Sequence, residues 1–288
     1  MKKVAIIGPG LLGGSAALAL RAQAGIHVAL WARRPEAIEE AMSLGVAQEV
    51  SSQLSTVVRD ADTVLLCVPV GAMEGLVRQM LPDLAPRTLV TDVGSVKGVV
   101  VETLAPLLEG RALFTGSHPM AGSEKAGIRF ARADLFANAT CIVTPRTPQE
   151  ASSEAVARAK ELWECLGGRV AFLSPHEHDR FCALISHMPH LLAAVLVHAV
   201  QASEPRAFAF CGPGFRDTTR VAGGLPEMWR EILCSNREAV LEALNAVSHQ
   251  IELAKALLHA PGSTAPDSTA PDSLLSFLAA AKSRRDTL

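Results

Sequence analysis

A glycine-rich turn close to the N-terminus constrains the fold of this chain more than any other stretch. Residues 3–7, KVAII, form an apolar run that predicts a buried strand. Gly8, Gly10 and Gly13 follow with the spacing G-x-G-x-x-G, and residues 11–24 then show the apolar periodicity of a helix. A strand, this turn and a helix in that order predict a Rossmann-type unit built on a parallel sheet.

Strands and helices alternate along the first part of the chain. Apolar runs predict further strands, and amphipathic segments such as residues 35–45 predict helices between most of them. The predicted strands are residues 27–32, 61–70, 87–95, 112–116 and 139–145. This order predicts an α/β fold with a doubly wound parallel sheet, helices on both faces, that continues to about Phe172.

The character of the sequence changes after this point. From Arg180 onward, Leu- and Ala-rich stretches with helical periodicity follow one another, and no strand pattern is found. We therefore expect a Rossmann dinucleotide-binding domain, an all-α domain, a linker rich in Pro and Ser, and a C-terminal segment that is either a short docking helix or a loose tail. Their predicted bounds are residues 1–173, 174–260, 261–273 and 274–288. The apolar helical domain is expected to form a homodimer.

Composition and charge disfavour several classes of protein. The chain has 288 residues, 49% of them hydrophobic, and a formal net charge of −2, so we expect no nucleic-acid partner. No apolar run reaches the roughly 18 residues of a membrane-spanning helix, so we expect no membrane association. The six cysteines are scattered without a C-x-x-C pair, which disfavours a zinc site or a disulfide framework and favours a cytoplasmic protein.

The glycine turn is typical of sites that bind the pyrophosphate of a dinucleotide. Gly8 allows the tight turn, Gly10 lets the backbone approach the pyrophosphate, and Gly13 allows close packing of helix and strand. Leu11 and Leu12 open the helix, whose N-terminal N–H groups attract an anion. A glycine turn without a ligand is the alternative interpretation.

The end of the second predicted strand indicates which dinucleotide binds. NAD sites usually have an acidic residue there, but Ala32 takes that position and Arg33 and Arg34 follow. Guanidinium groups can hold a 2′-phosphate by charge-assisted hydrogen bonds, so we predict NADP. Two solvated arginines at a helix start are the alternative. Val68 and Pro69 end another strand at the same edge of the sheet and are predicted to line the cofactor.

Four further stretches carry polar side chains that could form one chemical site. They are DVGSVK with Asp92, Ser95 and Lys97; SHPMAGSEKAG with His118, Ser123 and Glu124; ISHMPH with His187 and His190; and GFRDTTR with Arg216, Asp217 and Arg220. The first two stretches are predicted to follow strand ends, where ligands bind in parallel sheets. The small residues around His118 would let the backbone lie close to a ligand.

These stretches make the chain resemble the prephenate/arogenate dehydrogenase family of tyrosine biosynthesis. The resemblance rests on the glycine turn, DVGSVK, SHPMAGSEKAG and GFRDTTRVA with a following MW, and it covers nearly the whole chain. It implies the oxidative decarboxylation of a cyclohexadienol. Hydride leaves the ring carbon that bears the 4-hydroxyl, the hydroxyl loses its proton, carbon dioxide leaves, and the ring becomes aromatic.

The resemblance also implies roles for His118 and Ser95. His118 matches the catalytic histidine of the family, and an ordinary histidine pKa of about 6.5 suits a base at neutral pH. Ser95 would hydrogen-bond the same hydroxyl or orient His118, and it could also cap the following helix. The alternative for His118 is a structural histidine in a tight loop.

Substrate contacts are implied on the second domain and on the stretch after His118. Arg220 matches the arginine that holds the substrate carboxylate in the family, since a guanidinium can donate two parallel hydrogen bonds. Arg216, His190, Ser123 and Glu124 complete the expected contacts. A surface or ion-paired arginine is the alternative for Arg220. The resemblance implies no metal, and no carboxylate lies at ligand spacing on the helix of His190.

The sequence thus predicts NADP-dependent conversion of prephenate to 4-hydroxyphenylpyruvate. Arogenate dehydrogenase, which makes tyrosine, and a cyclohexadienyl dehydrogenase of dual specificity stay open, because the two substrates differ in one keto or amino group. A β-hydroxyacid dehydrogenase is a more distant alternative, which would normally have a catalytic lysine on a helix of the second domain. A dinucleotide-sensing protein without turnover would need neither His118 nor Arg220.

Overall fold

The computed structural model describes residues 1–123, 125–259 and 273–288 of the chain. These form two compact units, Met1–Arg237 and Glu238–Leu288. The linker predicted at residues 261–273 lies, apart from its last residue, outside the described residues. The domain bounds expected from the sequence stay predictions.

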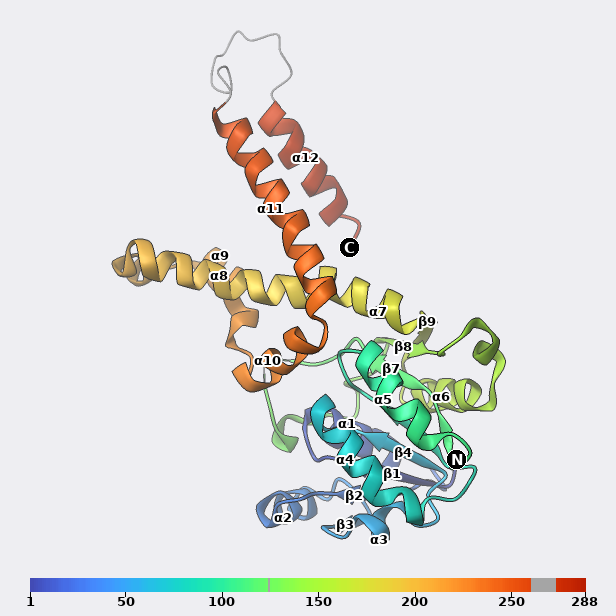
Figure 1. Cartoon of the computed structure of the whole chain (residues 1–288). Coiled ribbons are helices and arrows are strands. Elements are labelled where there is room, and N and C mark those ends of the chain that lie inside the picture. The colour runs from blue at the N-terminus through green and yellow to red at the C-terminus, as the bar shows by residue number, and fades with distance from the viewer. Residues whose placement is uncertain (124, 260–272) are drawn as a thin grey trace. The chain divides into compact units, whose positions relative to one another are not determined.

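A six-stranded parallel sheet forms the base of the first unit (Figure 1). The strand order is β3-β2-β1-β4-β5-β6. The strands are β1 (Lys3–Ile7), β2 (His27–Trp31), β3 (Glu49–Ser51), β4 (Thr63–Leu66), β5 (Leu89–Asp92) and β6 (Leu113–Phe114). The order reverses direction beside β1, and such a reversal places the ligand crevice of a parallel sheet at the carboxyl ends of the strands.

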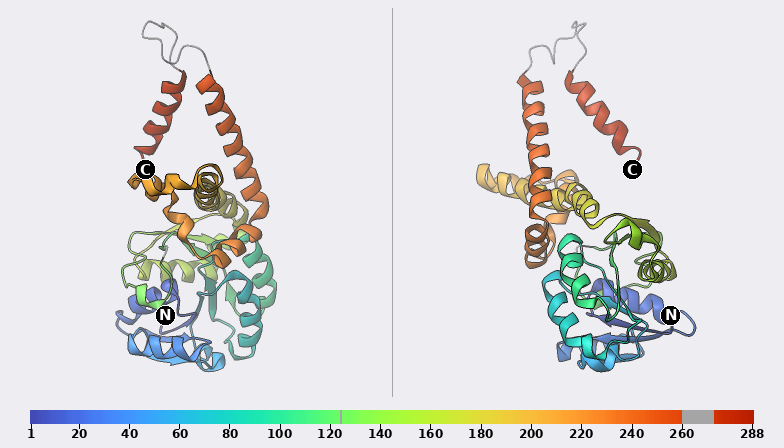
Figure 2. Two further views of the ribbon diagram at one scale, coloured as in Figure 1. Left: turned by 90° about the vertical axis from the view of Figure 1, so that its left-hand side faces the viewer. Right: turned by 45° about the vertical axis from the view of Figure 1, so that its right-hand side comes forward.

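Helices cover both faces of this sheet. On β1, Val4 and Ile6 belong to one buried cluster, whereas Ala5 and Ile7 belong to the other, because successive strand residues point to opposite faces. The first face packs against α1 (Leu11–Arg21), α2 (Pro35–Ser43) and α6 (Glu154–Cys165), and the second against α3 (Leu54–Val58), α4 (Val70–Met80) and α5 (Gly98–Leu108) (Figure 2). The prediction of a doubly wound α/β fold is confirmed.

The last strands of the first part depart from the prediction of one continuous parallel sheet. They form a separate sheet in the order β7 (Gly116–Pro119), β8 (Thr140–Thr144), β9 (Arg169–Phe172). β7 and β8 are antiparallel, and β8 and β9 are parallel. Only Thr115 separates β6 from β7, which leaves no room for the crossover helix that a parallel neighbour requires. The predicted strand at 112–116 is therefore divided between the two sheets.

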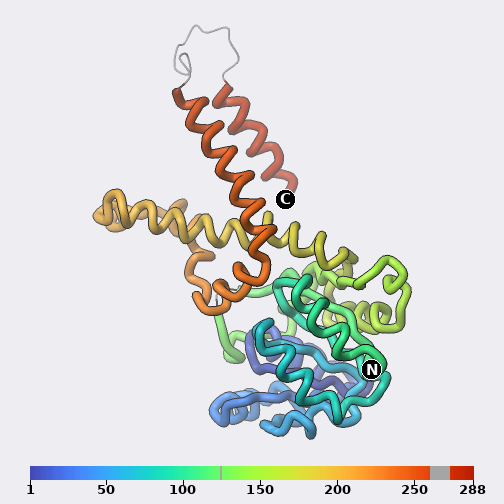
Figure 3. The backbone as a smooth tube through the Cα atoms, viewed as in Figure 1, coloured from blue at the N-terminus to red at the C-terminus, as the bar shows by residue number. Residues whose placement is uncertain are grey.

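The rest of the first unit is helical, as the sequence predicted. α7 (Pro175–Cys182) begins with a capping box between Ser174 and Glu177. It continues through a π-helical turn (Ala183–His187) into α8 (Met188–Ser203), and Figure 3 shows this run in yellow and gold. Two shorter helices follow, α9 (Pro213–Thr219) and α10 (Pro226–Ser235). Short 3₁₀ turns occupy Leu81–Asp83, Ile128–Phe130, Pro148–Ser152, Pro205–Phe210 and Arg220–Gly223.

The second unit contains the greater part of α11 (Arg237–His259) and all of α12 (Ser273–Arg285). α12 has 13 residues; it begins at the last residue of the predicted linker and continues into the segment predicted as a C-terminal tail.

Among the residues that the structure describes, one continuous helical run is long and apolar enough to cross a membrane, which the sequence did not lead us to expect. It spans Pro175–Ser203, 29 residues, with a mean hydropathy of 1.6 in its most apolar window. Length and composition do not distinguish a membrane span from a helix that packs against protein. This run also carries His178, Asp179 and His187, which are buried and hydrogen-bonded within the first unit.

Candidate active site

The glycine turn between β1 and α1 has the geometry expected of a dinucleotide loop. Gly8 has φ of +115°, and a Cβ there would lie 2.5 Å from the Cys67 carbonyl oxygen. A Cβ on Gly13 would lie 2.0 Å from the carbonyl oxygen of Gly8, so both positions exclude a side chain. A Cβ on Gly10 would meet no described protein atom within 4 Å. The fold itself thus explains the first and third glycines, whereas the second leaves open space beside the N-terminus of α1.

The other predicted cofactor residues follow the neighbouring strands β2 and β4. Ala32 is fully buried directly after β2, and Arg33 and Arg34 are exposed where α2 begins. Val68 and Pro69 lie between β4 and α4, with Pro69 exposed. Because β2, β1 and β4 are adjacent and parallel, their carboxyl ends meet at one edge of the sheet. The structure therefore brings the glycine turn, both arginines and Pro69 to the same edge.

His118 lies inside a strand, which corrects the sequence-based placement in a loop after a strand end. It pairs with Ile142 across the antiparallel ladder of β7 and β8, and its side chain is buried. Its ring Nδ1 is 2.8 Å from Nε2 of His178, which comes from α7, 60 residues later in the chain. The two imidazole rings meet edge to face, with their centroids 5.1 Å apart and their planes 66° from parallel.

A carboxylate anchors the second imidazole. Nδ1 of His178 is 2.7 Å from Oδ1 of Asp179. The same Oδ1 accepts a hydrogen bond from the Lys97 backbone N–H at 2.7 Å, and Oδ2 accepts one from the Gly98 N–H at 2.8 Å. Asp179 therefore satisfies the first N–H groups of α5 from a different helix. The alternative role for Ser95, as the cap of this helix, is wrong, because Lys97 is the N-cap residue and α5 starts at Gly98.

A buried ion pair lies beneath these residues. Asp92, the last residue of β5, pairs with the Lys97 ammonium, and both side chains are completely buried. Lys97 Nζ also donates to the Ser117 carbonyl at 2.9 Å, while Oδ1 of Asp92 accepts from the Ser117 N–H at 3.0 Å. Oδ2 of Asp92 accepts from the Gly94 N–H at 2.8 Å. Ser117 precedes His118, so the pair fixes β7 against β5.

Burial keeps the histidines of this cluster neutral. Burial lowers the pKa of His118 well below its usual value, and the nearby His178, Lys97 and His187 lower it further. Burial also lowers the pKa of His178, although the hydrogen bond with Asp179 opposes this shift. For Asp179, burial acts to raise the pKa, but hydrogen bonds from His178 and from two backbone N–H groups outweigh it and lower the pKa. The cluster thus contains an ionised carboxylate and two neutral imidazoles at neutral pH.

The two histidines of the ISHMPH stretch have different surroundings. His187 is fully buried, and its Nδ1 is 3.1 Å from the Asn236 amide nitrogen, which donates to it. His190 stacks on the Trp229 indole, with ring centroids 3.5 Å apart and planes 11° from parallel. A Cβ on Gly224 would lie 2.4 Å from the indole nitrogen, so only glycine leaves room for this stack. Burial lowers the pKa of His190, and a hydrogen bond with the Val221 backbone opposes that shift.

The remaining predicted substrate residues lie on the surface. Arg216 is exposed on α9, and its Nε donates to the Cys211 carbonyl at 3.4 Å. Arg220 is exposed and opens the 3₁₀ turn that contains Val221, so it is close in sequence to the backbone that bonds His190. Ser123 is exposed and accepts a hydrogen bond from the Lys125 N–H at 2.9 Å. Glu124 lies outside the described residues.

Sequence reasoning missed His178 and Asp179 as site residues. The SPHEHD stretch that carries them indicated a domain boundary and a helix start only. A signal was present, because His178, Asp179 and Cys182 share one face of α7 by helical spacing, and that face is buried. Buried charged and imidazole groups near a predicted base are candidates for its partners.

His118, His178 and Cys182 also present three donor atoms within 4.8 Å of one another, a spacing that could suit a metal ion. Two features of the cluster do not fit such a ligand set. The two imidazole nitrogens are already hydrogen-bonded to each other, and burial raises the pKa of Cys182 to about 12, which keeps the thiol protonated. The expectation of a protein without a metal site stays a prediction.

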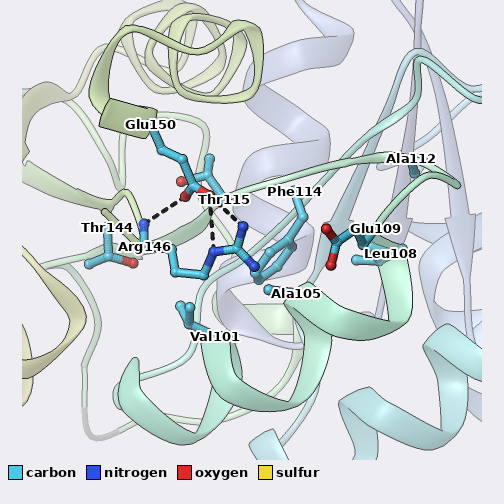
Figure 4. A pocket seen from close by; sticks show the side chains of 10 residues that line it. All are labelled: Val101, Ala105, Leu108, Glu109, Ala112, Phe114, Thr115, Thr144, Arg146 and Glu150. Carbon is cyan, nitrogen blue, oxygen red and sulfur yellow. Dashed lines mark hydrogen bonds and ion pairs between the residues drawn. The ribbon is translucent and has the colours of Figure 1, made fainter. Parts of the chain in front are cut away.

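A surface depression behind β7 contains none of the predicted site residues. Figure 4 shows its lining by α5, by Phe114 and Thr115, and by Thr144, Arg146 and Glu150. Arg146 and Glu150 form an ion pair of 2.7 Å at its rim. The Thr115 and Thr144 hydroxyls are buried without a hydrogen-bond partner among the described residues. The predicted site residues therefore lie elsewhere, at the carboxyl ends of the parallel strands, on β7 and on the helices that follow β9.

Comparison with known proteins assigns both parts of the chain to one kind of enzyme. The family model of the prephenate dehydrogenase nucleotide-binding domain matches residues 16–172, and the model of the prephenate dehydrogenase dimerization domain matches residues 174–277. A cyclohexadienyl dehydrogenase of Zymomonas mobilis is 37% identical over 251 residues, which is 85% of this chain and 84% of that protein. A prephenate dehydrogenase of Bacillus subtilis is 33% identical over 295 residues, covering 99% and 76% of the two chains.

A solved structure is similar over the whole chain. It is prephenate dehydrogenase from A. aeolicus in complex with hydroxyphenyl propionate and NAD+. The two chains align with a TM-score of 0.89 and 31% sequence identity, covering 100% of this chain and 98% of the other.

Proposed function

The chain belongs to the prephenate dehydrogenase family, and on that premise we propose that it oxidises and decarboxylates prephenate to 4-hydroxyphenylpyruvate with NADP. The observation that carries this proposal is the buried, neutral His118 hydrogen-bonded to His178, which in turn bonds the ionised Asp179, within the same unit as a dinucleotide loop. When bound, the nicotinamide supplies a hydride acceptor. The protein must then remove the hydroxyl proton and hold the carboxylates.

His118 would accept the proton of the 4-hydroxyl on its ring Nε2. A histidine whose pKa is lowered by burial is unprotonated at neutral pH, so a lone pair is available without prior loss of a proton. Ser95 lies between β5 and α5, next to His187, and would hydrogen-bond the same hydroxyl or orient His118. Loss of the proton directs electrons toward the ring carbon from which the hydride departs, and departure of carbon dioxide then completes the aromatic ring.

The substrate carboxylates would be held by the helical part of the unit. Arg220 is proposed to bind one carboxylate with two hydrogen bonds, and Arg216 to add positive charge beside it. His190, stacked on Trp229, would present one ring edge toward the substrate. Ser123, which follows the strand of His118, is proposed to contact the substrate, and the substrate contact expected of Glu124 stays a prediction.

The choice of NADP rests on the edge of the sheet after β2. Ala32 offers no carboxylate for a ribose hydroxyl, and the exposed guanidinium groups of Arg33 and Arg34 follow it directly, where they could donate hydrogen bonds to a 2′-phosphate. The A. aeolicus structure contains NAD+, so cofactor choice is where this chain is proposed to differ from that relative. A kcat/KM at least tenfold higher with NADP than with NAD is expected. Equal or higher efficiency with NAD would overturn this choice.

Dimerisation is proposed to use the helical part of the chain. The dimerization-domain model covers residues 174–277, and several large apolar side chains there are exposed in the single chain. They include Ile185, Val195, Leu196, Leu241 and Ile251. A homodimer would bury such side chains, and a monomer by sedimentation equilibrium would contradict it. The six cysteines are free, which supports the proposal that the protein works in a reducing cytoplasm.

The deciding experiment supplies purified protein with NADP and follows nicotinamide reduction with prephenate and with arogenate in parallel. Faster reduction with prephenate is expected. The similarity to a cyclohexadienyl dehydrogenase favours one second candidate, an enzyme of dual specificity, which would reduce NADP with both substrates. Reduction with arogenate alone would keep the residue roles and reverse the substrate assignment. No reduction with either substrate would overturn the proposed function.

A further inference from the structure

The hydrogen bonds around His118 have a direction that the carboxylate dictates. Ionised Asp179 can only accept, so at 2.7 Å the Nδ1 of His178 must carry the hydrogen. A neutral imidazole with hydrogen on Nδ1 has its lone pair on Nε2. That Nε2 lies 2.8 Å from Nδ1 of His118, which must therefore be the donor. The hydrogen of His118 is then on Nδ1, and its lone pair is on Nε2.

We propose that His178, oriented by Asp179, is a positioning residue that holds His118 in the tautomer with a lone pair on Nε2. This inference rests on the proposed role of His118 as the base that takes the hydroxyl proton. It goes beyond that role because an imidazole in water exchanges between two tautomers, and only one of them leaves Nε2 able to accept. The chain of hydrogen bonds from His118 through His178 to Asp179, called the relay below, also accommodates the proton after transfer, since a protonated His118 still donates from Nδ1.

Asp179 is itself held in place by bonds that do not involve the histidines. It accepts from the backbone N–H groups of Lys97 and Gly98 at the start of α5, and its own carbonyl accepts from Asn236 at 2.7 Å. The carboxylate therefore cannot rotate away from His178 without losing the cap of α5. Rigid support of this kind is what fixes a tautomer in a working site.

Other neighbours of the His118 ring do not supply this control. Cys182 Sγ is 3.8 Å from the same Nδ1 and 3.4 Å from Nε2 of His178, and a protonated thiol is a weak partner at that range. The Lys97 ammonium is bonded to Asp92 and to the Ser117 carbonyl. Within the described part of the chain, His178 is thus the one strong partner of His118 Nδ1.

Two substitutions at position 178 separate the two halves of the relay. In His178→Asn, the short amide can still donate to Asp179 but places no acceptor near His118. In His178→Gln, the longer side chain can place a carbonyl oxygen where Nε2 stood, so it can still accept from His118. His176→Gln is the matched control, because His176 is exposed on the same helix two residues earlier. His118→Asn, measured in parallel, reports on the base itself.

We expect His178→Asn to lower kcat with prephenate by about 10- to 100-fold with KM within about threefold, part of the 10² to 10⁴ that a positioned base contributes. His178→Gln should lose clearly less, and His176→Gln should match the wild type. Nitrogen-15 NMR of the labelled histidine rings in the intact protein should show His118 with hydrogen on Nδ1, and a mixture of tautomers in His178→Asn.

The outcomes distinguish a failure of the proposed relay from a failure of the proposed function of His118. If His118→Asn is inactive while His178→Asn keeps wild-type kcat, the relay is wrong and the proposed base stands. If NMR shows hydrogen on Nε2 of His118 in the wild type, the relay is wrong whatever the kinetics. If His118→Asn itself keeps full activity, the proposed function of His118 fails first. Should His178→Asn fold poorly by circular dichroism, the wild-type NMR spectrum still decides.

Discussion

The glycine turn and the buried cluster around His118 solve different physical problems within one unit. The turn is contiguous in sequence and acts through backbone shape, since a Cβ at Gly8 or Gly13 would collide with carbonyl groups. The cluster acts through side chains from β5, β7, α7 and the N-cap residue of α5, brought together from segments as far apart as Asp92 and Asp179. A shape requirement can be met by local residues, whereas a buried network of charges needs partners from several elements to satisfy each group.

Substitutions in the glycine turn and in the buried cluster should therefore have different effects. Changes in the turn should act on cofactor binding, because its open space lies beside the N-terminus of α1. Changes in the cluster should act first on stability and on proton chemistry, because its groups are buried and mutually dependent.

The largest effect on stability is expected from Lys97→Met. This change leaves the Asp92 carboxylate completely buried without its cation and should lower the free energy of unfolding by about 3–5 kcal/mol. Denaturant unfolding at one protein concentration measures it. Arg78→Met is the matched control, since its pair with Glu74 is exposed and should contribute under about 1 kcal/mol. An equal loss of unfolding free energy in the two variants would contradict the claim that the buried ion pair matters more for stability than the exposed one.

Acid is expected to destabilise the protein through the cluster. Burial lowers the pKa of His187 to about 4, and burial also lowers the pKa values of His118 and His178. The histidines of the unfolded chain become protonated below their usual pKa of about 6.5, whereas the buried histidines of the folded chain stay neutral. The free energy of unfolding therefore falls as the pH decreases. Each such histidine contributes at most about 1.4 kcal/mol per pH unit, until the pH reaches its folded-state pKa.

Unfolding measured between about pH 7 and pH 5 in His187→Asn tests this prediction. The shorter amide can keep the bond from Asn236 but does not titrate, so the variant should lose stability less steeply than the wild type. If the free energy of unfolding changes equally steeply with pH in the variant and the wild type, His187 does not contribute to the acid sensitivity.

Two alanine substitutions in the turn should separate shape from binding. Gly13→Ala places a methyl group 2.0 Å from a carbonyl oxygen and should destabilise the protein by about 1–3 kcal/mol. Gly10→Ala meets no described protein atom, so its melting temperature should stay near that of the wild type while NADP affinity falls. Thermal melting and fluorescence titration with NADP measure the two effects. A large loss of stability in Gly10→Ala would show that the second glycine has a structural role.

The smallest expected effect is at the edge of the cofactor site. Arg33→Ser with Arg34→Ser should raise the KM for NADP about tenfold, roughly 1.4 kcal/mol, while the KM for NAD changes little. Steady-state kinetics with both cofactors measure the ratio. An equal change for NADP and NAD would mean that these exposed arginines do not contact a 2′-phosphate.

The same contrast explains what the sequence could predict. The strand, turn and helix around Gly8, Gly10 and Gly13 are encoded within a few residues, so spacing alone predicted them and the structure confirms the fold. The separate sheet of β7 to β9 was not predicted, because apolar alternation in residues 139–145 does not specify whether the partner strand is parallel or antiparallel. The single-residue connection between β6 and β7 was the overlooked constraint.

The site was predicted in part for a related reason. His118 was singled out by its small neighbours and by resemblance, although as a loop residue and not as a strand residue. His178 and Asp179 could not be connected to it, because their distance in sequence becomes a hydrogen bond only after α7 packs against β7 and α5. Capping of α5 was the alternative role considered for Ser95, and the carboxylate of Asp179 does this instead. Local residue patterns do not show which distant residue will provide the hydrogen bond that a buried polar group needs.

The most direct test of the account measures kcat with prephenate and the Kd for NADP in one preparation of His118→Asn. If the buried cluster performs proton chemistry and the glycine turn performs binding, kcat falls at least about 100-fold while the Kd for NADP stays within about twofold of the wild type. A wild-type kcat would contradict the role of His118, and a large loss of NADP affinity would contradict the division of labour between the two regions.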